Sequence, residues 1–200
     1  MVAENNAIIS GTYGISENSE RQLLSFFKPL KERSLSPVSC TVDGNPQAIR
    51  VLKQLWTNIT IQRCLVHVQR QGLMWCRRYP QGPYAKRLRE IFQQVTNIRT
   101  KEECDRFLGV VSNWEKKYGS YIATHPDRGK VFSDIKRARS MLLKALPDMF
   151  HYLDNLNIPM STNGLEGYFS RLKGHYRHHR GLHPTKRKNY FAWYFHLCSR

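Results

Sequence analysis

One stretch, Pro37–Arg70, constrains the fold of this 200-residue chain more than any other. It opens with a short β-rich run that stops at Asp43-Gly, and Asn45-Pro then offers an N-cap and a first-turn proline for a helix. Apolar residues follow at helical spacing, and Ile59–Val68 is a second β-branched run. Two strands that flank a helix pair in parallel through a crossover. The stretch therefore predicts an α/β fold.

Asp43 lies where the first predicted strand ends. The carboxyl ends of parallel strands form the crevice in which such folds bind ligands, so an acid there is placed for chemistry. Asp-Gly is also typical of an ordinary turn, and the dipeptide alone is compatible with both interpretations.

Cys64 and His67 lie in the second β-branched run. Residues three apart on an extended strand point to opposite faces. Both side chains can face one site only if the strand ends near Cys64 and a helical turn begins there. We expect that turn.

The charge of the chain favours a polyanionic partner. Lys and Arg number 32 against 15 Asp and Glu, which gives a net charge of +17. Residues 1–60 carry +1, residues 61–160 carry +9 and residues 161–200 carry +7, so we expect nucleic acid to meet the last two regions. Glu166 is the one acid among the last forty residues, which also hold five of the eight histidines.

Other classes of protein are disfavoured. No run approaches the ~20 apolar residues of a membrane span, and the N-terminus lacks the pattern of a signal peptide. Five scattered cysteines argue against a disulfide framework. We expect an intracellular protein of the cytoplasm or nucleoid, without a membrane partner.

Periodicity suggests three regions. We expect a partial α/β core over residues 1–70, an all-helical segment over residues 71–157, and a C-terminal helix with a basic tail over residues 158–200. The individual elements expected are a strand at Ala7–Ser10, a helix capped by Ser19, and helices at Lys86–Val95, Lys101–Trp114 and Phe132–Leu153.

Glu166 has two interpretations. Asn163-x-x-Glu166 has the form of a capping box, which would give the acid a structural role. The alternative is metal binding, because carboxylate oxygens are the hard ligands that Mg²⁺ prefers, and a metal brought to a phosphate needs its acids within a basic surface.

The order of these motifs resembles the Mutator-like superfamily of DDE transposases, which includes insertion-sequence members. The motifs are Asp43-Gly, QRCLVHVQR at 62–70, a long helical block, and STNGLEGYFSRLK at 161–173. The resemblance implies an RNase H-like mixed sheet interrupted by an all-helical insertion. Asp43 is similar to the second catalytic aspartate, Glu166 to the catalytic glutamate, and Cys64 and His67 to the family's Cys-x-x-His pair.

The activity that the resemblance implies is two-metal phosphodiester cleavage and strand transfer in DNA transposition. Asp43 and Glu166 would be catalytic metal ligands, with Mg²⁺ or Mn²⁺ as the cofactor. The implied partners are double-stranded DNA, as transposon ends and target, and further copies of the chain in a homo-oligomer. The residues expected to bind the DNA backbone are Arg70, Arg171, Lys173, Arg177 and Arg180.

The sequence also departs from the family pattern. The family places its first catalytic aspartate on an earlier strand, whereas Asp43 is the first aspartate of this chain. None of the preceding glutamates lies at the head of a central strand. We therefore expect an N-terminally truncated transposase whose first acid lies upstream of residue 1, and a chain that is inactive by itself.

Two other functions remain open at this stage. The chain could be a DNA-binding remnant without catalysis. It could also be a regulatory module in which Cys64 and His67 bind zinc. Two further zinc ligands would then come from His175, His178, His179 and His183.

Overall fold

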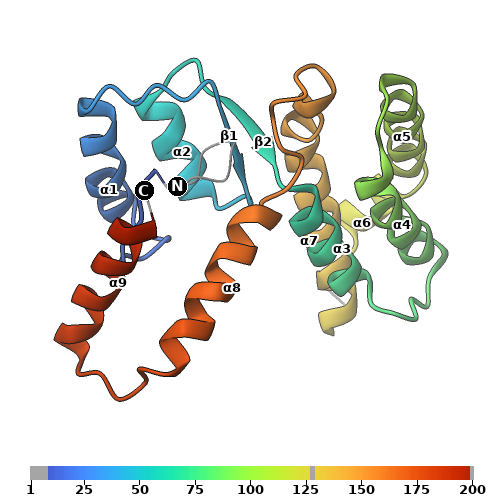
Figure 1. Ribbon diagram of the computed structural model, residues 1–200. Coiled ribbons are helices and arrows are strands. Elements are labelled where there is room, and N and C mark those ends of the chain that lie inside the picture. Colours follow the sequence, from blue (N-terminus) through green and yellow to red (C-terminus); the bar gives the residue numbers. More distant parts are fainter. Residues whose placement is uncertain (1–8, 127–128, 199–200) are drawn as a thin grey trace. The chain divides into compact units, whose positions relative to one another are not determined.

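The structure is a computed structural model that describes residues 9–126 and 129–198 (Figure 1). Its contacts divide the chain into two units. Unit 1 extends to Ile61 and resumes at Asn157, and unit 2 comprises Gln62–Leu156. Asp43 and Glu166 therefore belong to unit 1, whereas the Cys64–His67 pair belongs to unit 2.

The first helix of unit 1 begins where its cap predicts. Helix α1 spans Glu20–Glu32, and the Ser19 hydroxyl accepts a hydrogen bond from the backbone N–H of Gln22. Leu23 and Leu30 are buried on its apolar face, and α1 packs against α2 (Pro46–Leu55). The predicted helix capped by Ser19 is confirmed.

The strand, helix and strand predicted within Pro37–Arg70 are confirmed in that order. Strand β1 (Ser39–Val42) pairs with β2 (Thr60–Arg63) in parallel, and α2 is the crossover between them. The Asn45 side chain caps α2 by accepting the N–H of Ala48 at 3.0 Å, next to the first-turn proline. The core here is a buried cluster of Leu52, Trp56, Ile59 and Ile61.

The predicted fold class is wrong. The chain is 67% helical, and its described residues form one sheet of two parallel strands instead of the RNase H-like mixed sheet of an α/β fold. The β-branched run Ile59–Val68 is strand only as far as Arg63, because α3 begins at Leu65. The strand expected at Ala7–Ser10 falls partly outside the described residues, and Ile9 and Ser10 are not in a strand.

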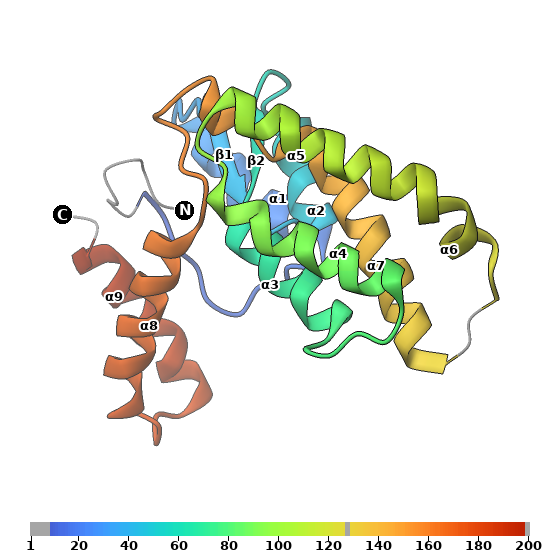
Figure 2. The same cartoon turned by 90° about the vertical axis from the view of Figure 1, so that its right-hand side faces the viewer.

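Two long helices follow one another in the last part of unit 1. Helices α8 (Asn163–Arg177) and α9 (Pro184–Cys198) form a hairpin whose seam buries Tyr168 and Leu172 against Phe191 and Phe195 (Figures 1 and 2). The ring of Tyr13 stacks on Phe191, with centroids 4.4 Å apart.

The segment before α1 therefore covers part of α9. Gly11 makes the closest approach, because a Cβ there would lie 2.6 Å from the Phe195 ring. Only glycine fits at that position without displacement of the ring.

Unit 2 begins with the last two residues of β2, and every regular element after them in its described part is a helix. Helix α3 (Leu65–Cys76) packs against α4 (Pro83–Gln94) and α7 (Gly129–Ala145), and α4 packs against α5 (Lys101–Trp114). A π-helical turn at 115–119 continues into the short α6 (Ser120–Thr124). Figure 2 shows α3, α4, α5 and α7 gathered into one group of helices.

The core of unit 2 is closely packed and includes a buried amide. Gly72 of α3 lies against Phe92 of α4, and a Cβ at Gly72 would come within 2.2 Å of that ring. Gln62 is fully buried, and its side-chain amide donates to the carbonyls of Arg63 at 2.8 Å and Met149 at 2.7 Å. The first residue of unit 2 is thereby bound close to its last helical turns.

Helix α7 is shorter than predicted. The apolar spacing predicted a helix over Phe132–Leu153, but α7 ends at Ala145 and two 3₁₀ turns, 146–148 and 151–153, follow it. Pro147 explains the difference, because it has no backbone N–H and disfavours helical geometry at the residue before it. The helix at Lys101–Trp114 is confirmed at both ends.

Across the described ranges, 9–126 and 129–198, no helix has both the length and the apolar composition that crossing a membrane would take.

Candidate functional site

Asp43 follows the last residue of β1 and is exposed. One carboxylate oxygen, Oδ1, accepts the backbone N–H of Asn45 at 3.0 Å. Gly44 between them has φ +106°, a conformation that favours glycine. The Asp-Gly pair is thus a turn, and the same turn leads directly into the cap of α2. The exposed side chain can meet a ligand while Oδ1 orders the turn.

Glu166 lies in the first turn of α8, and its side chain is half-buried with Oε1 inaccessible to solvent. The capping box predicted at Asn163-x-x-Glu166 is not formed. Asn163 is already the first helical residue, and the cap position falls to Thr162, whose side chain makes no capping hydrogen bond. Glu166 therefore lies one position beyond the one that a capping box requires. The position still suits an acid, because the N-terminal end of a helix favours negative charge.

The segments that carry these two acids meet within unit 1. The Thr41 hydroxyl of β1 donates to the carbonyl of Pro159 at 2.7 Å, across 118 positions of sequence. Thr41 lies two residues before Asp43, and Pro159 lies four residues before α8 begins. Figure 1 shows the start of α8 beside β1. The convergence of the two carboxylates on one ion remains a prediction.

Cys64 and His67 adopt the turn that their spacing requires. Strand β2 ends at Arg63, Cys64 is the N-cap of α3, and His67 lies in the first turn of that helix. His67 Nδ1 lies 3.2 Å from Cys64 Sγ. Cys64 is fully buried and His67 half-buried. The expected change from strand to helix is confirmed, and it brings the two side chains into contact.

Basic side chains expected to bind DNA are exposed. Arg70 is exposed on α3 of unit 2. The other four follow Glu166 along α8 and into the turn after it, where they are exposed as well: Arg171, Lys173, Arg177 and Arg180. Exposed cations on a helix can bind backbone phosphates without reading sequence.

Comparison with known proteins decides the family. The family model described as "Transposase, Mutator family" matches residues 4–183, which is most of the chain. The chain belongs to the Mutator family of transposases. Among curated proteins and among solved structures, the comparisons found no match. Helix α9 begins at Pro184, just beyond the matched residues.

Membership of the Mutator family implies a transposase role, with DNA as partner, and places the chain among DNA-cutting enzymes. Transposases in general use divalent metal ions. The described residues of this transposase chain do not assemble a full metal site, because no three of their His, Cys, Asp or Glu side chains gather into a group that could hold an ion. Two hard-oxygen donors on adjoining segments suit a divalent cation, but they do not make a complete set.

The same finding bears on the zinc alternative. Four donors from cysteine and histidine are the usual set for structural zinc. Within the described ranges, Cys64 and His67 are not joined by a third such donor.

Other acids near the start of this chain are paired with basic residues, exposed in a turn, or outside the described residues. Glu20 forms an ion pair with Arg50, and Glu32 lies 3.9 Å from Lys28 one turn away on α1. Glu4 falls outside the described residues. Glu17 is exposed in the turn before α1.

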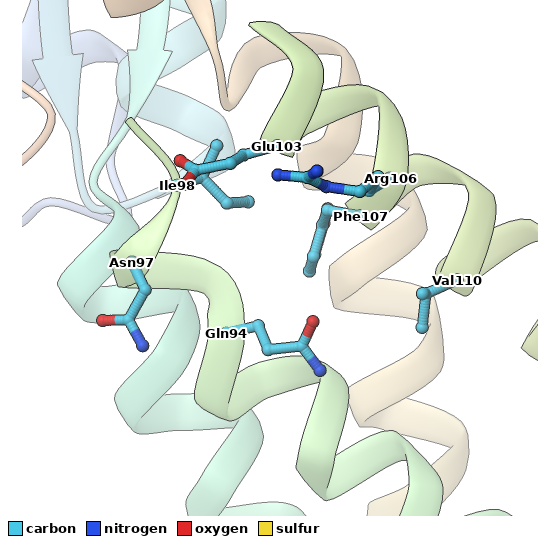
Figure 3. A pocket seen from close by; sticks show the side chains of 7 residues that line it. All are labelled: Gln94, Asn97, Ile98, Glu103, Arg106, Phe107 and Val110. Atoms are coloured by element: carbon cyan, nitrogen blue, oxygen red, sulfur yellow. The ribbon is translucent and has the colours of Figure 1, made fainter. Parts of the chain in front are cut away.

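A hollow of about 360 Å³ lies in unit 2 between the end of α4 and the start of α5 (Figure 3). None of the predicted site residues lines it. Glu103 is committed to a capping box with Thr100, and the Gln94 amide donates to the carbonyl of Glu90. Two of its polar side chains are thus engaged within their own segment, and Asn97 and Arg106 are the other polar residues of the lining. Its lining residues are Gln94, Asn97, Ile98, Glu103, Arg106, Phe107 and Val110.

Sequence reasoning missed two features of the site region. No local pattern points to the contact between Thr41 and Pro159. Helix α9 was also missed, although Pro184 at its first position after His183 is a helix-start signal. Aromatic residues on every side of that segment hid the helical period.

Proposed function

We propose that this chain cuts and joins DNA phosphodiester bonds as the catalytic part of a Mutator-family transposase, with Asp43 and Glu166 as the carboxylates that hold divalent metal. The observation that carries the proposal is the Thr41–Pro159 hydrogen bond. It ties the strand that leads to Asp43 to the segment that leads to Glu166. A contact of this kind is what two ligands 123 positions apart in the printed sequence need in order to act together.

The chain's own groups have distinct roles in this proposal. Asp43 and Glu166 supply hard oxygen ligands suited to Mg²⁺ or Mn²⁺. Ions of this kind provide Lewis acidity at the scissile phosphate for cleavage and strand transfer. The exposed cations after Glu166 bind backbone phosphates, with Arg70 of unit 2 as a further contact. Cys64 and His67 order the start of α3 and support the site indirectly.

The test measures binding of Mn²⁺ by electron paramagnetic resonance in the 200-residue chain and in Asp43→Asn and Glu166→Gln. Each variant keeps the size of the side chain and removes one anionic ligand. We expect each to weaken Mn²⁺ binding at least tenfold, because loss of one of so few ligands removes much of the site. Glu32→Gln is the matched control, since it neutralises an exposed acid of the same unit. If Glu32→Gln weakens binding as much as the other two, the two carboxylates do not form a site.

A second candidate function is DNA binding without catalysis by this chain. It is favoured by one observation, which is that the described residues contain no group of three metal-binding side chains. Incubation of the chain with transposon-end DNA and Mg²⁺ or Mn²⁺ separates the two. Salt-sensitive binding without nicking supports the second function. Nicking that Asp43→Asn abolishes supports the first.

A further inference from the structure

The outer face of α9 carries a tryptophan that the hairpin does not use. Trp193 is 64% exposed and Leu197, one turn later, is 61% exposed. The other described tryptophans are shielded, with Trp56 and Trp114 at 7% and 3% exposed and Trp75 half-buried. Among the described residues, Trp193 is therefore the tryptophan whose ring a partner can reach most readily.

The inner face of the same helix is already occupied. Phe191 and Phe195 pack against Tyr168 and Leu172 of α8. The 11–13 segment lies over the same two rings, through Tyr13 on Phe191 and through Gly11 against Phe195. The hairpin thus holds α9 in a fixed orientation by its inner side. Trp193 is exposed on the side of α9 that these contacts leave open.

The residues around Trp193 are basic and polar. Lys186, Asn189, Trp193 and Leu197 follow one another at spacings of three and four along α9, so they share one face. All four are exposed. The imidazole of His196 lies edge-on to the Trp193 ring, with centroids 6.0 Å apart. Lys188 is exposed one position before Asn189.

Charge selects the class of partner. No acidic residue follows Glu166 in the sequence, whereas α9 carries Lys186, Arg187 and Lys188 in its first turns. A second copy of the chain would bring the same positive charge to this face and be repelled. A polyanion would be attracted. An exposed aromatic ring beside lysines is the combination that binds single-stranded nucleic acid, because an unpaired base stacks on the ring while the cations meet its phosphates.

We propose that Trp193 is a stacking platform for an unpaired DNA base, and that Lys186, Lys188 and Asn189 bind the backbone on either side. A paired base is stacked within its duplex and does not offer its face to a side chain, so the platform prefers single-stranded over double-stranded DNA. This inference rests on the proposed function only for its choice of DNA as the partner. It adds a preference for DNA whose strands are separated, as they are where a strand is being exchanged.

The test compares the 200-residue chain with Trp193→Ala and Trp193→Phe. Binding of a fluorescein-labelled oligo(dT) of about 15 nucleotides and of a duplex of equal length is measured by anisotropy at about 0.15 M salt. We expect Trp193→Ala to weaken oligo(dT) binding about 5- to 150-fold, the range for loss of one stacked base, and to change duplex binding by less than about twofold. Trp193→Phe retains a ring and should bind oligo(dT) within a few-fold of the parent chain.

Tryptophan fluorescence gives a second readout that needs no variant to fold. Trp193 is the exposed indole, so oligo(dT) should quench the emission of the parent chain, and the duplex should quench it much less. Equal loss of affinity for both DNA forms in Trp193→Ala would overturn the proposal. So would unchanged oligo(dT) binding, or equal quenching by the two forms.

The alternative partner for this face of α9 is a second copy of the chain. Sedimentation of the parent chain, Trp193→Ala and Leu197→Ala tests that alternative. If the parent chain is a dimer that both substitutions convert to monomers while oligo(dT) affinity is unchanged, this face binds a second copy and the proposal is wrong. The oligo(dT) binding comparison is also independent of the proposed metal site. Asp43→Asn and Glu166→Gln leave Trp193 intact, so failure of the proposed catalysis would leave the oligo(dT) preference in place.

Discussion

The hydrogen bond between Thr41 and Pro159 is the contact on which the proposed site depends, and Thr41→Val removes it with almost no change of shape. The hydroxyl donates to the Pro159 carbonyl at 2.7 Å. A neutral hydrogen bond contributes about 0.5–1.5 kcal/mol to stability. Thr41 is half-buried and Pro159 is exposed, so water can replace the lost partner of the carbonyl. We therefore expect a loss of about 1 kcal/mol, which is about a fivefold change in a local equilibrium.

Amide hydrogen exchange at the start of α8 measures this change in the local equilibrium. In Thr41→Val the amides of the first turns of α8, including Glu166 whose N–H donates to Thr162 at 2.9 Å, should exchange about fivefold faster. Amides of α4 in unit 2 should be unaffected. Binding of Mn²⁺ should weaken by no more than a similar factor, because the ligands themselves are intact.

Thr41→Ser is the control for this prediction. It keeps the donor and should retain most of the protection at the start of α8. If Thr41→Val leaves that protection unchanged, or if serine and valine behave alike, the hydrogen bond does not hold the start of α8 and the argument for the site loses its support.

Two further predictions concern stability in unit 2. Gly72→Ala should destabilise the chain by about 1–3 kcal/mol in urea unfolding, because the added Cβ would lie 2.2 Å from the Phe92 ring. Gly109→Ala is the control and should not destabilise it, since the space around its Cβ is open. Equal effects of the two substitutions would contradict the packing argument. Burial raises the pKa of the Cys76 thiol from 9.0 to about 12. As pH rises, the thiol therefore loses its proton in the unfolded chain before it does so in the folded chain. The free energy of unfolding should fall above about pH 9, by up to about 1.4 kcal/mol per pH unit. Below about pH 9 this thiol should have no effect, and Cys76→Ala should show a flatter alkaline decline than the parent chain.

Local signals gave correct predictions at several places where a few neighbouring residues decide the backbone. Ser19 and Asn45 cap the helices that they were expected to cap, and the spacing of Cys64 and His67 correctly required a strand to end there. Caps and turns are short-range interactions, so the sequence carries them directly. The turn at Asp43-Gly is of the same kind.

The sheet could not be predicted in the same way. The β-branched residues of Ile59–Val68 fit a strand along the whole run, but burial of Leu65 and Val68 within unit 2 outweighs strand propensity and α3 begins there. The larger sheet came from family resemblance, and the described residues contain one pair of strands. At α8 the helix begins one residue earlier than the capping pattern implies, and boundaries of this kind depend on contacts that a local pattern does not contain.

The residues of the candidate site and their convergence were predicted, but the contact that brings their segments together was not. Asp43 and Glu166 stood out as isolated acids at the ends of elements. The contact that brings their segments together joins positions 118 apart and involves a backbone carbonyl, which leaves no trace in residue types. Whether the carboxylates share an ion is decided by side-chain positions that the sequence does not specify.

The buried amide of Gln62 has a consequence for how unit 2 is joined to the rest of the chain. Its hydrogen bond to Met149 closes a segment whose bonded residues are 87 positions apart. The entropic cost of closing a loop grows only slowly with its length, and a segment that folds by itself and joins its own ends removes most of that cost from its host. To the rest of the molecule, such a segment behaves as a short connection. Homologous segments of quite different size could be exchanged at this point, and a circular permutant opened within the segment should be tolerated better than one opened within β1.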